Sequence, residues 1–162
     1  MVEKDKNRAQ AIGHIASGLF IICGEDENKK IDGFLASWVQ QLSFTPPLIA
    51  FAIKPGRPAY DVITQGQLFS VNIVGEHEKG YLRYFWKGYD PQNSPFEEAV
   101  EYDRGENEGI IMRNAKSALE CRLKEIIKPG DHELVVAEVL ASYTLNENGR
   151  PTVHVRKSGS DY

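Results

Sequence analysis

Short apolar runs separated by turn-forming residues are the feature that most restricts the fold of this chain. Gly18–Cys23 (GLFIIC) and Leu48–Ile53 (LIAFAI) are continuously apolar, and Leu68–Val74 (LFSVNIV) is rich in branched residues. Runs of this length, bounded by Gly, Pro, Asn and Asp, are typical of buried strands. We therefore expect a protein made mainly of β-strands.

The order of the runs favours antiparallel pairing. Leu119–Lys124 (LECRLK) alternates apolar and charged residues, which predicts a strand with one face in water. Leu134–Ala141 (LVVAEVLA) is its expected antiparallel partner, and Gly18–Cys23 should form a hairpin with Ile31–Trp38 through a turn at Asp26–Lys30. Short helices are expected at residues 8–16, 59–66 and 76–86, and a loop at residues 90–98. Many short strands with few helices predict a Greek-key-like antiparallel β-barrel with short helices, and not βαβ units.

One connection is unusually long and polar. Ser37–Pro47 (SWVQQLSFTPP) exceeds the ~4–6 residues of an ordinary connection, so we expect a long loop that is either functional or simply irregular. With its backbone N–H groups, Ser37 and Ser43 could hold a phosphate or the polar edge of a planar ring. Lys54 and Arg57 precede the helix expected at residues 59–66, and cations beside a helix N-terminus favour phosphate binding. The alternative is that both cations are solvated and the serines only satisfy the loop.

Length and charge bound the class of protein. The 162 residues fit one domain, expected to span residues 1–162, and 41% hydrophobic with 26% charged residues is a globular composition. A net charge of -4 argues against a nucleic-acid partner, because phosphate binding needs a cationic face. No apolar run approaches the ~20 residues of a membrane span, so no membrane partner is expected.

Cysteine usage and the N-terminus predict a cytoplasmic location. The N-terminal MVEKDKNRAQ is charged and lacks the apolar core of a signal peptide. Cys23 and Cys121 are far apart without CxxC spacing, which fits two buried thiols in a reducing compartment.

Three common kinds of site are disfavoured. The histidines show no ligand spacing with Cys or with one another, so no metal site is predicted; they are His14, His77, His132 and His154. No GxSxG elbow accompanies the serines, which argues against hydrolysis by a serine nucleophile. The GxGxxG fingerprint of a Rossmann domain is also missing.

Several motifs, in order, resemble the flavin reductase-like, FMN-binding split-barrel family. They read GFLASW, QQLSFTPP, LIAFAI, KPGRPAYDVI, GQLFSVNIV, YLRYF and GDHELVVAEV, and the resemblance covers about residues 9 to 155. Within the family, ASWVQQLSF and VHVRKSGSDY look most like the C-terminal flavin reductase domain of cyanobacterial flavodiiron proteins. This chain begins at Met1 without a diiron or flavodoxin module, so we expect a single module.

The resemblance implies a set of flavin-binding residues. The ring edge would meet Leu35, Ala36, Ser37 and Trp38, where fixed N–H dipoles stabilise the charge of reduced flavin. Leu42, Ser43 and Phe44 would wrap the ribityl chain and phosphate, with Lys54 and Arg57 on the phosphate side and Phe85 near the ring. Structural alternatives stay open: Ser37 capping a strand end, Trp38 filling the core, and Phe85 packing on a helix face.

His132, in the turn Gly130–His132, is the candidate catalytic residue. In similar reductases this position lies near the nicotinamide, where a hydrogen bond orients the ring over the flavin. An ionisable group in a turn beside the expected pocket suits that role, and the alternative is an ordinary polar turn.

The resemblance implies an NAD(P)H:flavin oxidoreductase. It would be a homodimer with one FMN per subunit near the interface, FAD being the other flavin to consider. Hydride would pass from NADH or NADPH to the flavin, and reduced flavin or electrons would go to an acceptor, including a partner protein. The alternative is an FMN-binding electron-transfer protein that does not oxidise nicotinamides itself.

Overall fold

The computed structural model describes residues 3–57 and 59–160, most of which lie in or between β-strands. The strands are β1 (Phe20–Glu25), β2 (Ile31–Ala36), β3 (Val39–Phe44), β4 (Pro47–Ile53), β5 (Leu68–Ile73), β6 (Tyr102–Arg104), β7 (Ile110–Met112), β8 (Ser117–Ile127) and β9 (Glu133–Thr144). The helices are α1 (Glu3–Gly13), α2 (Tyr60–Gly66) and α3 (Pro95–Glu98), with the 3₁₀ turns η1 (Gly80–Tyr84) and η2 (Pro91–Asn93).

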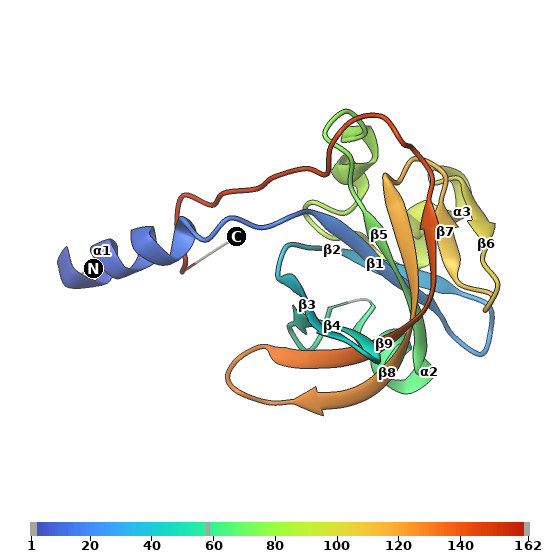
Figure 1. Cartoon of the computed structure of the whole chain (residues 1–162), viewed down its shortest axis with the longest axis horizontal. Helices are drawn as coiled ribbons and strands as arrows, with labels where there is room; N and C mark the ends of the chain where they lie inside the picture. Colours follow the sequence, from blue (N-terminus) through green and yellow to red (C-terminus); the bar gives the residue numbers. More distant parts are fainter. Residues whose placement is uncertain (1–2, 58, 161–162) are drawn as a thin grey trace.

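Seven strands of the described part of the chain form one antiparallel sheet. Their order is β2-β1-β5-β8-β9-β4-β3, and a separate small sheet pairs β6 with β7. The long sheet curls, so that β2 contacts β4 although they lie near opposite ends of the order. Figure 1 shows the resulting barrel, with α2 at its lower right. The predicted mainly β antiparallel barrel is confirmed.

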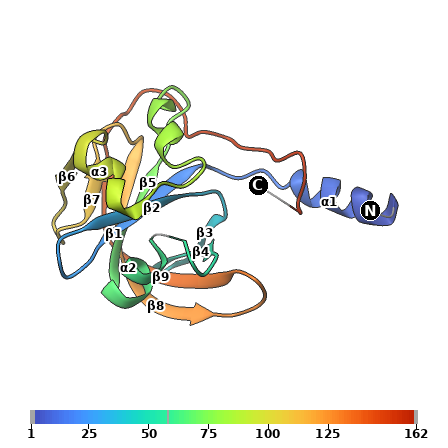
Figure 2. The ribbon, with the colours of Figure 1, turned by 180° about the vertical axis from the view of Figure 1, so that it is seen from behind.

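In the described part of the chain, two apolar cores lie on opposite faces of the sheet. Inside the barrel, Phe51 of β4 packs against Phe34 and Phe69, with ring centroids 6.2 and 5.4 Å away. On the outer face, Ile21 and Cys23 of β1 join a second core. Figure 2 shows α3, β6 and β7 gathered beside β1, β2 and β5 on this side. Both faces of β1 are therefore buried, which explains its continuous apolar run.

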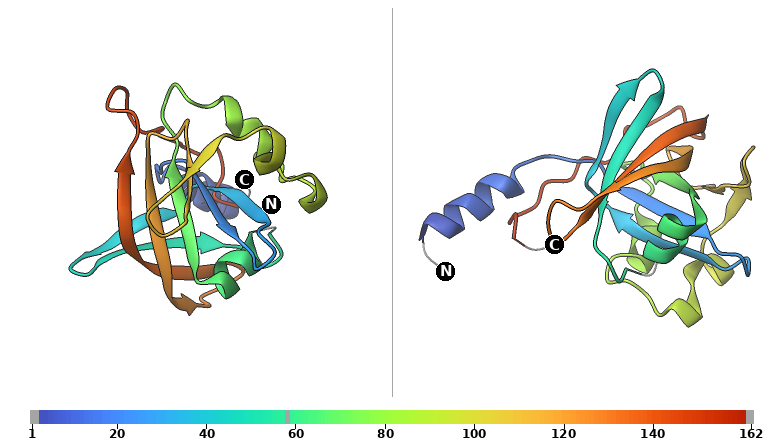
Figure 3. Two further views of the ribbon diagram at one scale, coloured as in Figure 1. Left: turned by 90° about the vertical axis from the view of Figure 1, so that its right-hand side faces the viewer. Right: turned by 90° about the horizontal axis from the view of Figure 1, so that it is seen from below.

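α1 and the C-terminal segment, residues 150–160, extend from the barrel side by side (Figures 1 and 3). The Ser17 backbone N–H donates to the His154 carbonyl over 2.9 Å, and that of Arg156 to Gly13 over 3.1 Å. A Cβ on Gly13 would lie 2.9 Å from the Arg156 carbonyl oxygen. Glycine is needed here because the two backbones approach too closely for a side chain.

The prediction of a loop at Ser37–Pro47 is wrong. Most of the segment is β3, which pairs antiparallel with β4 through a tight turn at the cis Thr45–Pro46 peptide. The polar residues Gln40 and Gln41 misled the prediction, because they lie exposed on an edge strand. Their polarity reflects contact with water and not a lack of strand hydrogen bonds.

Three other local predictions need correction. The helix expected at residues 76–86 is only the short turn η1, and Gly80, a poor helix former, stands at its start. Residues 90–98, expected as a loop, contain η2 and α3. In β8, Glu120 was expected on the wet face but is 2% exposed, because the loop after β6 covers it.

Candidate functional site

A cleft lies where α1 and the C-terminal segment meet the β3–β4 hairpin. Its volume is ≈ 790 Å³, within the range of about 300–1,000 Å³ usual for small-molecule sites. We call it the tail cleft. Its lining residues are Ile12, Ile15, Ala16, Ser17, Gly18, Ser37, Trp38, Val39, Gln40, Leu42, Ala50, Ala52, Leu134, Pro151, Thr152, Val153 and Arg156.

The alternation of β4 makes room for the cleft. Ile49, Phe51 and Ile53 point into the barrel core. Successive side chains of a strand face opposite sides, so Ala50 and Ala52 face outward and line the cleft. Their short side chains leave space that larger residues would fill. The run LIAFAI therefore builds a core on one face and the floor of a cavity on the other.

Trp38 contacts two other side chains at the edge of the tail cleft. The His132 ring lies with its centroid 5.0 Å from that of Trp38, tilted by 56°. The guanidinium carbon of Arg156 lies 4.9 Å from the Trp38 ring centroid, close enough for a cation–π interaction. The β2–β3 connection, the β8–β9 turn and the C-terminal segment thus meet at one indole ring.

His132 is held from its other side by its neighbour in the chain. Its Nδ1 lies 3.0 Å from Asp131 Oδ1, and its side chain is 13% exposed. This hydrogen bond holds the pKa of the Asp131 carboxyl below its usual value. The candidate catalytic imidazole therefore contacts Trp38, which lines the tail cleft, but does not line the cleft itself.

The pocket beside Arg57 is far smaller than the tail cleft. Its volume is ≈ 20 Å³, and a single water needs about 10–15 Å³ measured in this way. It is lined by Phe34, Leu35, Ala36, Ser37, Trp38, Ala52 and Arg57. The predicted ring-edge residues Leu35–Trp38 are thus brought together with Arg57, but in a space that admits about one water molecule.

Other predicted site residues are more scattered. Leu42 lines the tail cleft, whereas Ser43 and Phe44 line neither it nor the pocket beside Arg57. Lys54 is exposed, and Phe85 is 2% exposed in the outer core, where its ring packs against those of Phe96 and Tyr89 at 5.5 and 5.9 Å. The packing alternative for Phe85 matches this position.

The sequence reasoning missed the contribution of the chain ends. Arg156 and Thr152 line the tail cleft from the C-terminal segment, and Ile12 and Ile15 from the N-terminal one. The available signal was the ending VHVRKSGSDY, which contributed to the resemblance but carried no assigned role.

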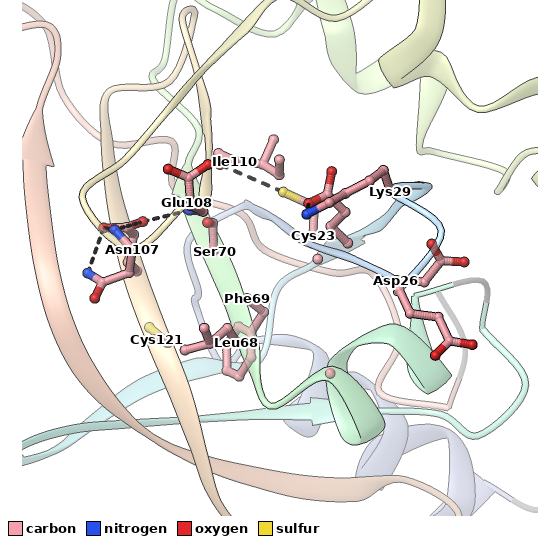
Figure 4. A pocket seen from close by; sticks show the side chains of 16 residues that line it. Cys23, Asp26, Lys29, Leu68, Phe69, Ser70, Asn107, Glu108, Ile110 and Cys121 are labelled. Carbon is pink, nitrogen blue, oxygen red and sulfur yellow. Dashed lines mark hydrogen bonds and ion pairs between the residues drawn. The ribbon is translucent and has the colours of Figure 1, made fainter.

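A second pocket of ≈ 370 Å³ lies between β5, β8 and the loop before β7. Figure 4 shows Cys23, Ser70 and Cys121 at its wall. Burial raises the pKa of each thiol to about 12. Both cysteines therefore stay protonated and unreactive at neutral pH, and we place no chemistry there.

Fold and cleft together define a class: an antiparallel barrel with a cleft of small-molecule size on the outer face of β4. The model of the flavin reductase-like domain matches residues 12–160, and the chain belongs to this family. The resemblance carried by the motifs is thereby confirmed.

Curated relatives with similar sequences match nearly the whole chain. Diflavin flavoprotein A 1 of Synechocystis is 31% identical over 159 residues, which are 98% of this chain and 27% of that protein. The chain thus spans about a quarter of the length of the curated relatives it matches.

Solved structures agree on the fold. The styrene monooxygenase flavin reductase of Pseudomonas putida is 25% identical, with a TM-score of 0.76 and 90% of each chain covered. The NADH:FAD oxidoreductase of Streptomyces globisporus has a TM-score of 0.81 at 18% identity, covering 94% of this chain and 89% of its own. Among the described residues, no helix is long and apolar enough to cross a membrane.

Proposed function

We propose that this chain is an FMN-dependent flavin reductase that transfers hydride from NADH or NADPH to flavin. The single observation that carries the proposal is the tail cleft. It has the volume of a small-molecule site, mostly apolar walls and an indole at its edge. Reduced flavin or its electrons would then pass to an acceptor, such as a partner protein in the same reducing, cytoplasmic compartment.

A flavin fits the residues of the tail cleft. The isoalloxazine is planar and largely apolar, which suits the floor of Ala50 and Ala52. Its phosphate needs donors, and Arg156 with the Thr152 hydroxyl offers them. The pocket beside Arg57 admits about one water and does not fit the ring.

A flavin held in the tail cleft would supply the redox chemistry as a hydride acceptor. The chain would supply binding, orientation and exclusion of water. Ser37 at the cleft wall offers a hydroxyl to the polar ring edge. His132 would hydrogen-bond the nicotinamide, with Asp131 fixing the orientation of its imidazole.

A second candidate is an FMN-binding electron-transfer protein with no nicotinamide oxidation of its own. The position of His132 favours it, because the ring lies against Trp38 and its side chain is only 13% exposed. In that case the protein would exchange electrons with a partner and leave nicotinamides unoxidised.

One experiment tests the proposal and separates the two candidates. The purified protein is mixed with FMN, the visible spectrum is recorded, and NADH or NADPH oxidation is followed with and without added FMN. For the reductase we expect flavin binding and flavin-dependent oxidation. A yellow protein inert towards both nicotinamides would identify the electron carrier. A protein that neither binds nor reduces flavin would rule out both.

A further inference from the structure

We propose that Arg156 and Thr152, both on the C-terminal segment, bind the phosphate of the planar ligand in the tail cleft. The inference rests on the proposed function and adds to it, since it names the residues that distinguish a phosphorylated ligand from its unphosphorylated form. Neither residue belongs to the set predicted from the sequence.

Charge is the first observation. Of the described residues that line the tail cleft, Arg156 is the one charged side chain. Ile12, Ile15 and Val153 make much of the wall apolar. A charge is screened less beside apolar walls than in open water. An anionic group on the ligand is therefore drawn to Arg156, whose guanidinium matches phosphate with paired hydrogen bonds.

Arg156 is also already positioned. Its guanidinium carbon lies 4.9 Å from the Trp38 ring centroid, and its backbone N–H donates to the Gly13 carbonyl over 3.1 Å. Stacking uses the face of the guanidinium and leaves its in-plane N–H groups to donate. Less side-chain entropy is then lost when an anion binds.

Thr152 provides an independent observation. Thr152 is 3% exposed, and in the described structure its Oγ1 has no hydrogen-bond partner. Its backbone N–H donates to the Val74 carbonyl over 2.8 Å, which fixes the residue at the cleft wall. Buried hydroxyls are normally hydrogen-bonded, and an unpartnered one is costly. A phosphate oxygen in the cleft would supply the missing acceptor.

The rival cation is Arg57. It lines the pocket of ≈ 20 Å³, which has room for about one water and not for a phosphate. Arg156 borders a space roughly forty times larger, as the ≈ 790 Å³ of the tail cleft shows. The volumes therefore favour Arg156 as the phosphate-binding residue.

The test compares FMN with riboflavin, which differ only in the phosphate. Dissociation constants for both are measured by quenching of flavin fluorescence on the wild type, Arg156→Gln, Thr152→Val and Arg57→Gln. We expect Arg156→Gln to weaken FMN binding by about 10- to 100-fold and to leave riboflavin binding nearly unchanged. Thr152→Val should give a smaller loss, also confined to FMN. Lys157→Gln, which removes a neighbouring exposed cation, is the matched control.

Different outcomes of this test would overturn the inference about Arg156 and the proposed function. The inference is overturned if Arg156→Gln weakens both flavins equally, or if the FMN preference disappears in Arg57→Gln instead. If the wild type binds neither flavin, the proposed function fails. Nicotinamide mononucleotide and nicotinamide riboside then replace the flavin pair. A phosphate preference lost in Arg156→Gln would support the inference for that nucleotide, and no such preference would refute it.

Discussion

At the scale of single residues, Trp38 is the side chain that two other candidate site residues contact. It lines both the small pocket beside Arg57 and the tail cleft, as Ser37 and Ala52 also do. It also contacts the imidazole of His132 and the guanidinium of Arg156. Trp38 therefore connects the lining of the tail cleft to the imidazole of His132.

His132→Ala tests the role of the imidazole. If His132 orients the nicotinamide, the variant should slow reduction of bound FMN by NADH by about 10- to 100-fold, the loss of one oriented hydrogen bond. FMN affinity should stay nearly unchanged, because the side chain does not line the tail cleft. Stopped-flow reduction and an FMN titration measure the two effects. His77→Ala, at an imidazole that is 79% exposed, is the control. Equal losses of rate and affinity would make His132 structural.

At the scale of elements, the sequence predicted best the strands whose pattern is local. β1, β4 and β5 were predicted because their apolar runs are continuous, and the β8–β9 hairpin because both partners carry strong patterns. β3 was missed because an edge strand tolerates polar residues on its exposed face. The same holds for the site. Ser37 and Trp38 were predicted from a local motif, whereas Arg156 is distant in sequence and is brought to the same cleft only by folding.

The loop after β6 is held by hydrogen bonds to the carboxylate of Glu120, a side chain that the sequence pattern predicted to be exposed. Asn107 and Gly109 donate backbone N–H groups to Glu120, and the Tyr143 hydroxyl donates to it over 2.8 Å. A Cβ on Gly105 would lie 2.5 Å from the Glu120 carboxyl carbon. The loop can therefore approach the carboxylate only with glycine there. Burial raises the pKa of Glu120, but these hydrogen bonds outweigh it and hold the pKa below its usual value.

Glu120→Ala should therefore destabilise the fold. It leaves several N–H donors without a partner, and we expect a loss of about 3 kcal/mol at pH 7. Because the folded pKa lies below the unfolded one, the stabilisation is complete above about pH 4.3 and disappears as the pH falls through the folded value. Urea unfolding of wild type and variant at pH 7 and pH 3 measures the difference, which should shrink at pH 3.

Glu125→Ala, at an exposed position of the same strand, is the control for this prediction. It should change the free energy of unfolding by less than about 0.5 kcal/mol. A difference between wild type and Glu120→Ala that is the same at both pH values would show that the carboxylate charge has no part in holding the loop.

At the scale of the whole molecule, the elements that build the tail cleft carry exposed apolar side chains. Ile15 is 68% exposed, Val153 75% and Phe44 87%. The first two lie on the extended chain ends, and Phe44 lies on β3, an edge of the long sheet. Large exposed apolar patches mark interaction surfaces. We propose that a second copy of this chain covers the patch, as the family resemblance implies, and shields the tail cleft from water.

Ile15→Asp and Phe44→Asp test this homodimer. A carboxylate in an apolar interface is costly to desolvate, so each variant should shift the protein from dimer to monomer in light scattering at micromolar concentration. Circular dichroism should be unchanged, since both side chains are exposed within one chain. Trp86→Asp, at an aromatic that is 70% exposed after η1, is the matched control and should remain dimeric. Dissociation by Trp86→Asp alone would place the interface on the η1 side of the barrel, and a monomeric wild type would mean that the tail cleft binds its ligand without a second copy.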